Sequence, residues 1–198
     1  MNLANGFDLS TRSGIDRALH EAALQKPKEA WISIPCTPWT STQNFNVHRN
    51  PEKLAKQRKD SRRMMRLVTE LIVQLLQQGA KVAFEYPLRA SAWGIDEMQT
   101  ICKHLPYCCK TDGCCYGMRT IDTNELVLKQ WRIQCSHGDM PGRLPFRCQK
   151  THKHATSEGH SKRMSATSYY PMPMAKRWMK RVLAPRDMRT VSGTADTD

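Results

Sequence analysis

A long helical pattern between two short β-favouring runs constrains the fold of this chain most. The first run, residues 31–35, ends in a proline, which has no N–H to donate to a neighbouring strand. The helical pattern covers residues 52–78, follows a proline and stops at a glycine. The second run covers residues 81–87. Because a helix between two strands usually crosses over the sheet, this order predicts two parallel strands.

Further patterns extend this unit to one α/β domain. Helical patterns cover residues 14–24, 94–104 and 172–183, and β-favouring runs cover residues 107–110 and 126–135. We therefore predict a mainly parallel, Rossmann-like sheet in three layers, with a small irregular C-terminal region. The domain is expected to cover residues 1–184. Residues 185–198 have few apolar side chains to bury, so we expect a disordered tail there.

Two residues at the ends of the first two predicted strands are candidate catalytic groups. Cys36 comes directly after the first strand, between two prolines, and Glu85 lies near the end of the second. Parallel neighbours would bring both side chains to the edge of the sheet where α/β proteins bind ligands. A thiol there is a candidate nucleophile. The alternatives are that Cys36 is a small buried apolar residue and that Glu85 is a surface carboxylate.

The charge of the chain indicates a polyanionic partner. The 198 residues include 31 Lys and Arg against 18 Asp and Glu, a formal net charge of +13 at pH 7. Nucleic acid fits this surplus most simply, and the basic residues cluster at residues 53–66, 150–163 and 176–189. The first cluster lies in the first half of the long helical pattern. We predict phosphate contacts by its basic residues Lys53, Arg58, Arg62, Arg63 and Arg66. The alternative is a basic face that only aids solubility.

The sequence also bounds the compartment. The first ten residues lack the basic start and apolar run of a signal peptide, and no apolar stretch approaches the roughly 20 residues of a membrane span. Eight cysteines in such a chain indicate reduced thiols, metal ligands or catalysis rather than disulfides. We therefore expect an intracellular protein, nuclear or cytoplasmic, with no membrane partner.

Four short motifs resemble those of the DNA (cytosine-5) methyltransferases, in the same order. They are Pro35-Cys36, Glu85, Gln130-Trp131-Arg132 and the segment from Tyr170 to Ala175. The resemblance implies that Cys36 is the nucleophile, that Glu85 contacts N3 of the base, and that Arg132 gives electrostatic support. It also implies a partial methyltransferase fold and S-adenosylmethionine as the methyl donor. Divergent domains of this kind also occur in the polyproteins of mobile elements.

The sequence departs from this family at positions that bear on activity. Thr37 and Tyr86 replace the family's Gln and Asn after the two catalytic residues, and Gln134 replaces its second arginine. The family's glycine-rich cofactor loop would lie before residue 6 and has no counterpart in this sequence. We therefore expect a divergent or truncated relative, in which catalysis depends on a partner chain or an added segment that supplies the cofactor site.

Metal binding by cysteine and histidine is the competing interpretation. Four residues could form a tetrahedral zinc site, namely Cys135, His137, Cys148 and either His152 or His154. Adjacent pairs such as Cys114-Cys115 suit one zinc poorly, because neighbouring side chains in a strand point opposite ways. The protein would then be a basic nucleic-acid-binding module without catalysis.

Overall fold

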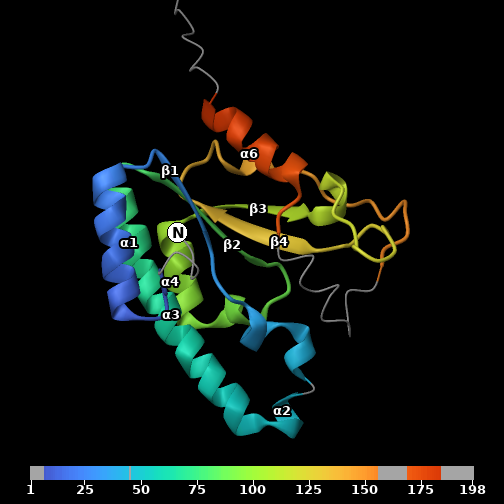
Figure 1. Cartoon of the computed structure of the whole chain (residues 1–198), viewed down its shortest axis with the longest axis horizontal. Coiled ribbons are helices and arrows are strands. Elements are labelled where there is room, and N and C mark those ends of the chain that lie inside the picture. The colour runs from blue at the N-terminus through green and yellow to red at the C-terminus, as the bar shows by residue number, and fades with distance from the viewer. Residues whose placement is uncertain (1–6, 45, 156–168, 184–198) are drawn as a thin grey trace, which may run out of the picture.

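The computed structural model describes residues 7–44, 46–155 and 169–183. Its strands form one four-stranded sheet with the order β1-β2-β4-β3 (Figure 1). The strands are β1 (Glu29–Ser33), β2 (Lys81–Pro87), β3 (Tyr107–Asp112) and β4 (Gln130–Cys135). The longer helices are α1 (Arg12–Gln25), α3 (Pro51–Gln77), α4 (Asp96–His104) and α6 (Met172–Leu183). The predicted tail over residues 185–198 lies outside the described residues.

Short helical turns connect these elements. They are α2 (Asn46–Arg49) and the 3-10 turns η2 (Thr37–Trp39), η3 (Ser41–Asn44), η4 (Ser91–Gly94), η5 (Gly113–Tyr116) and η6 (Pro141–Arg143). Among the described residues, no helix is long and apolar enough to cross a membrane.

The α/β class is confirmed, but the prediction of a mainly parallel sheet is wrong. β1 and β2 pair parallel, as the crossover through α3 predicts. β4 instead enters between β2 and β3 and pairs antiparallel with both. The cause is the connection over residues 113–129, which contains no α-helix. Parallel neighbours need a crossover, usually helical, so the chain returns antiparallel here.

The sheet separates two hydrophobic cores. On one face the alternate residues Val82, Phe84 and Tyr86 of β2 pack with α1, α3 and α4. On the other face Ala83 of β2 and the inward residues of β4 pack with Trp178 of α6. Figure 1 shows α6 apart from the three other long helices, on the opposite side of the sheet. The molecule therefore has three layers, as predicted.

The loop after β1 is held by the first half of α3. The N–H of Trp39 in η2 donates to the carbonyl oxygen of Cys36 at 2.9 Å, and its indole donates to the Ser61 hydroxyl at 2.8 Å. Both Trp39 and Ser61 are buried. This half of α3 extends past the end of the sheet (Figure 1). It therefore positions the loop that carries Cys36.

Candidate functional site

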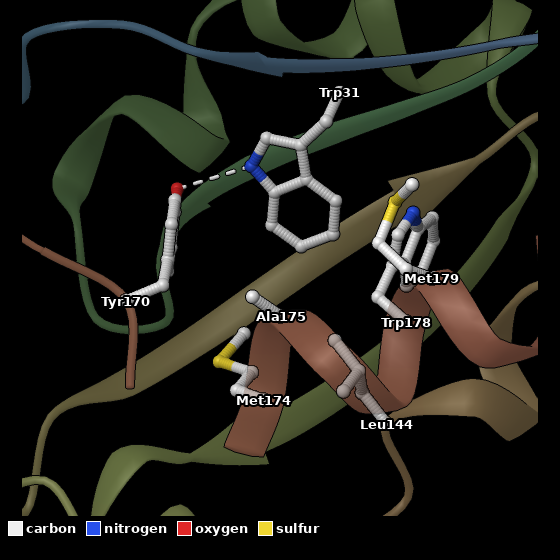
Figure 2. A pocket seen from close by; sticks show the side chains of 7 residues that line it. All are labelled: Trp31, Leu144, Tyr170, Met174, Ala175, Trp178 and Met179. Atoms are coloured by element: carbon white, nitrogen blue, oxygen red, sulfur yellow. Dashed lines mark hydrogen bonds between the residues drawn. The ribbon is translucent and has the colours of Figure 1, made fainter. Parts of the chain in front are cut away.

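The first candidate site lies where β1 and β2 run side by side. Ser33 pairs with Glu85 in the parallel register, and its hydroxyl donates a hydrogen bond of 2.8 Å to Glu85 Oε2. Tyr170, just before α6, donates a second hydrogen bond of 2.5 Å to the same oxygen. The Trp31 indole in turn donates to the Tyr170 hydroxyl at 3.1 Å (Figure 2). The carboxyl group of β2 is therefore held by both β1 and the C-terminal segment.

Electrostatic interactions couple Cys36 to this carboxyl group. Glu85 is only 5% exposed, and burial raises its pKa, although hydrogen bonds and the charge of Lys129 lower it in part. Burial also raises the pKa of the Cys36 thiol; Glu85 raises it further and Lys129 lowers it. At neutral pH the thiol is thus protonated, and the carboxyl group keeps a proton to higher pH than it would in water.

Arg132 lies on the other face of the sheet. Its neighbour Ile133 pairs with Glu85, so Arg132 itself points to the opposite face, as alternation along a strand requires. There its guanidinium lies 4.3 Å from the centroid of the Trp93 ring. The resemblance implied that Arg132 supports the catalytic groups. The structure instead places Arg132 on the opposite face of the sheet from the carboxyl group of Glu85. The lysine that interacts with the carboxyl group is Lys129, one residue before β4.

An apolar cavity of about 180 Å³ adjoins this site. Trp31, Tyr170, Met174 and Trp178 contribute to its lining, and Figure 2 shows these side chains around it. The Trp31 ring meets Tyr170 and Trp178 edge-on, with centroid distances of 5.4 and 4.8 Å. The cavity thus lies beside the hydrogen bond that links Trp31 to the carboxyl site, and its walls are aromatic rings and apolar side chains.

The second candidate site is a group of two cysteines and two histidines. Cys114 of η5 meets Cys148, His152 and His154 from the loop after η6, and the four ligand atoms lie within 4.8 Å of one another. Cys148 Sγ is 3.7 Å from His152 Nε2 and 3.4 Å from His154 Nε2. Cys114 is buried and the other three are partly buried. This group could hold a metal ion.

Contacts outside the group hold Cys148 in place. The Asp112 carboxylate accepts hydrogen bonds from the Cys148 N–H at 2.8 Å and from Arg147 Nε at 3.0 Å. The Lys150 N–H donates to the Cys148 sulfur at 3.3 Å. Lys150 has a φ of 60°, a left-handed turn that brings the chain back so that His152 reaches the sulfur. Such outer contacts orient ligands in metal sites.

The predicted zinc ligands are divided by the structure. Cys148 and His152 belong to the group, as does His154, which was the alternative. Cys135 instead is fully buried within the core between the sheet and α6. His137 is exposed just after β4 and lies outside the group.

Three of the predicted phosphate-binding arginines make contacts within the protein. Arg62 and Arg66 form ion pairs with Glu97 of α4, and the Arg62 pair measures 2.9 Å. Arg58 and Arg62 lie over the Trp39 ring, 5.3 and 5.9 Å from its centroid. These arginines therefore help to attach α4 and the Cys36 loop to α3.

Lys53 and Arg63 are placed differently on the same helix. Both are exposed, and neither forms an ion pair with an acidic side chain in the described part of the chain. Arg66 is exposed as well but is paired with Glu97, so Lys53 and Arg63 are the exposed members of the five that have no ion pair in the described residues.

Two residues that sequence analysis did not assign had recognisable signals. Lys129 is the one charged residue in the apolar run of residues 126–131, which indicates a buried partner of opposite charge. Cys114 was set aside because Cys115 follows it. The structure brings one thiol of the adjacent pair into the group, but the pair lies in the turn η5, so alternation along a strand is not the reason.

Comparison with known proteins gives no relative. No known protein family matches the chain, and neither a curated protein nor a solved structure does. Functional proposals for this chain therefore depend on its own residues and on the motif resemblance.

Proposed function

We propose that the chain is a divergent cytosine-C5 methyltransferase-like protein that binds DNA. Cys36 is the nucleophile and Glu85 the acid at N3 of the base. The observation that supports this most is the interaction between the thiol that follows β1 and a buried carboxyl group on the parallel neighbour β2. Tyr170, from a third motif of the resemblance, donates a hydrogen bond to the same carboxyl group.

The steps assigned to the chain are a thiol addition and a proton transfer. The Cys36 sulfur bonds to cytosine C6, and the π electrons of the C5–C6 bond move to C5 while N3 takes the proton of Glu85. The raised pKa of Glu85 favours the protonated form that gives this proton. Lys129 favours the thiolate that must form before attack. Once C5 has bonded to an incoming group, such as a proton from water, its original hydrogen leaves as a proton to solvent and the S–C6 bond breaks. The C5–C6 double bond is thereby restored, the Cys36 sulfur leaves as a thiolate, and N3 returns its proton to Glu85.

Two further requirements belong to this chemistry. The target base must leave the duplex stack to reach a buried thiol. S-adenosylmethionine would supply the methyl group at C5, and no described residue is assigned to hold it. We therefore derive only the thiol and carboxyl steps, which the residues in hand can perform.

Hydrogen exchange at cytosine C5 tests this proposal without a methyl donor. Once the thiol has added, C5 takes a proton from water, so a tritium atom at C5 is released when the adduct breaks down. We expect the full chain to release tritium from random-sequence duplex DNA labelled at every cytosine C5. Release should fall at least about 100-fold in Cys36→Ser and in Glu85→Gln, the loss typical of a missing proton-transfer group.

The matched control is Cys102→Ser, because Cys102 is another partly buried free thiol that lies on α4. This variant should exchange hydrogen as the wild type does. Release by the wild type that does not exceed the Cys36→Ser background would overturn the catalytic proposal.

The Cys/His group favours a second candidate function, a zinc-containing nucleic-acid-binding module without catalysis. Two thiolates and two imidazoles are a common ligand set of structural zinc. With Zn–S near 2.3 Å and Zn–N near 2.0–2.1 Å, tetrahedral S and N ligands stand about 3.6 Å apart. The two measured S···N separations around Cys148 are 3.4 and 3.7 Å. The ligand types and these two separations therefore fit Zn²⁺.

Metal analysis of the purified full chain tests the zinc proposal. We expect about one zinc per chain, the ratio for a single four-ligand site. Cys148→Ser should lose the metal, while Cys108→Ser, which removes an exposed thiol of β3, should keep it. Equal zinc in the two variants would show that the metal is bound elsewhere. Zinc without tritium release would favour the non-catalytic function.

A further inference from the structure

Lys129 lies in a segment with little regular structure of its own. Residues 117–129, between η5 and β4, contain no helix and only isolated bridges. The Lys129 carbonyl oxygen accepts a hydrogen bond of 2.7 Å from the N–H of Gly113, the residue before Cys114. One end of this segment is therefore attached to η5, which supplies the first ligand of the Cys/His group.

The same segment is attached to the other ligands a few residues earlier. Val127 forms a parallel bridge with Ala155, the residue after His154. Within this bridge the Ala155 N–H donates a hydrogen bond of 2.8 Å to the Leu126 carbonyl oxygen. An ion that joined Cys114 to His154 would thus connect both attachments of residues 126–129.

We infer that zinc on the Cys/His group positions Lys129 beside Cys36 and Glu85, and so sets the reactivity of the Cys36 thiol. This inference rests on the proposed zinc site and is independent of the proposed catalysis. Lys129 is a positioning and electrostatic residue here, because its ammonium group favours the thiolate form of Cys36. Among the described residues, Glu85 of β2 also acts on Cys36, because its charge raises the pKa of the thiol. Tyr86 of β2 responds to Cys36, because the thiolate charge raises the pKa of the phenol.

The pH profile of Cys36 alkylation tests the inference. The full chain, loaded with zinc or stripped by a chelator, is treated briefly with iodoacetamide between pH 7 and pH 11, and Cys36 labelling is followed by peptide mass spectrometry. We expect zinc removal to raise, by about one pH unit, the pH at which the Cys36 alkylation rate is half its maximum (the midpoint). This is the lower end of the effect of a nearby opposite charge. Greater exposure of the thiol would lower this midpoint, since burial raises the pKa of Cys36, whereas loss of the Lys129 charge would raise it.

A double-mutant design assigns the effect to Lys129. Lys129→Met should shift the Cys36 midpoint as far as zinc removal does, and removing zinc from this variant should add nothing. Lys110→Met, which removes an exposed lysine of β3, should behave as the wild type. His152→Asn should reproduce the effect of the chelator, and His104→Asn, at the exposed end of α4, should not.

Each outcome decides between the proposals. The inference is overturned if the wild type binds zinc but its Cys36 midpoint does not move when zinc is removed. It is also overturned if zinc removal shifts the midpoint equally in the wild type and in Lys129→Met. Both results leave the proposed zinc site intact. A chain that binds no zinc overturns both the inference and the zinc site. If zinc removal unfolds the chain, all eight cysteines should label alike. In that case the inference is tested with zinc-loaded protein alone, and it is overturned if Lys129→Met has the same Cys36 midpoint as the wild type.

Discussion

At Glu85 a carboxyl group lies where its charge is poorly solvated. Ser33 and Tyr170 donate hydrogen bonds to it, and Lys129 is near, yet burial has the largest effect and raises its pKa. The folded chain therefore holds a proton that the unfolded chain loses above the ordinary carboxyl pKa of 4.5. The stabilisation is complete below that value and is lost as pH rises through the folded pKa.

This sign gives a prediction for Glu85→Gln. Between pH 4.5 and 7.5 the free energy of unfolding of the wild type should fall relative to the variant, with a slope of up to about 1.4 kcal/mol per pH unit. Urea unfolding at several pH values measures it. Glu125→Gln, at an exposed position, is the control and should run parallel to the wild type. A constant difference between wild type and Glu85→Gln across this range would show that the carboxyl group is ionised when folded.

The helix α3 carries two kinds of basic residue, those that make contacts within the protein and those that remain available to a partner. Its arginines at positions 58, 62 and 66 contact Trp39 or Glu97, whereas Lys53 and Arg63 are exposed and form no ion pair in the described part of the chain. We predict that the double variant Lys53→Glu, Arg63→Glu weakens binding to duplex DNA. Its salt dependence should flatten by about two in log–log slope, since each lost phosphate contact removes roughly 0.9.

Binding titrations between 50 and 200 mM salt measure this effect. The control changes the net charge equally through Lys28→Glu with Lys110→Glu, two exposed residues outside α3. Equal weakening by both double variants would mean that the net charge, and not this helix, determines binding.

Arg143 connects β1 to α6 on the other side of the sheet. Its guanidinium makes two hydrogen bonds to Glu29, of 2.6 and 2.8 Å, and lies 4.9 Å from the Trp178 ring centroid. The side chain is only 3% exposed. A buried ion pair is costly to leave half intact, because the remaining charge keeps no partner.

We therefore predict that Arg143→Met lowers the free energy of unfolding by about 3–5 kcal/mol. The control is Arg12→Met, which breaks ion pairs at a side chain that is 55% exposed and should cost far less, because water screens exposed charges. Urea unfolding compares both variants with the wild type. Similar losses in the two variants would contradict a structural role for the Arg143 pair.

For the whole molecule, the Cys/His group joins two segments that the sheet does not pair. Cys114 lies after β3, and the other three ligands follow η6. Zinc at 1,000 times its dissociation constant should raise the free energy of unfolding by about 4 kcal/mol. Thermal unfolding with and without zinc checks this prediction. Cys148→Ser should show no zinc dependence, and an equal rise in that variant would place the metal elsewhere.

Much of the fold was predictable from the sequence because its helices and strands follow from local patterns of apolar and turn-forming residues. The predicted helix 52–78 is α3 (Pro51–Gln77), and the predicted helix 172–183 has the bounds of α6. The strand–helix–strand order also predicted correctly that β1 and β2 are parallel. It follows that Cys36 and Glu85 were expected at one edge of the sheet, and the two groups do interact.

The remaining features depend on pairings between distant segments. The antiparallel entry of β4 places Ile133 opposite Glu85 and turns Arg132 to the other face, so Lys129 becomes the cation of the site. Likewise Cys114 reaches its partner ligands only because η5 and the loop after η6 fold together. Sequence by itself determined the elements and the side chains that could react, since periodicity and turn residues act over a few positions. Only the tertiary structure decided which of them meet, because a shift of one residue in strand register reverses the face of every side chain.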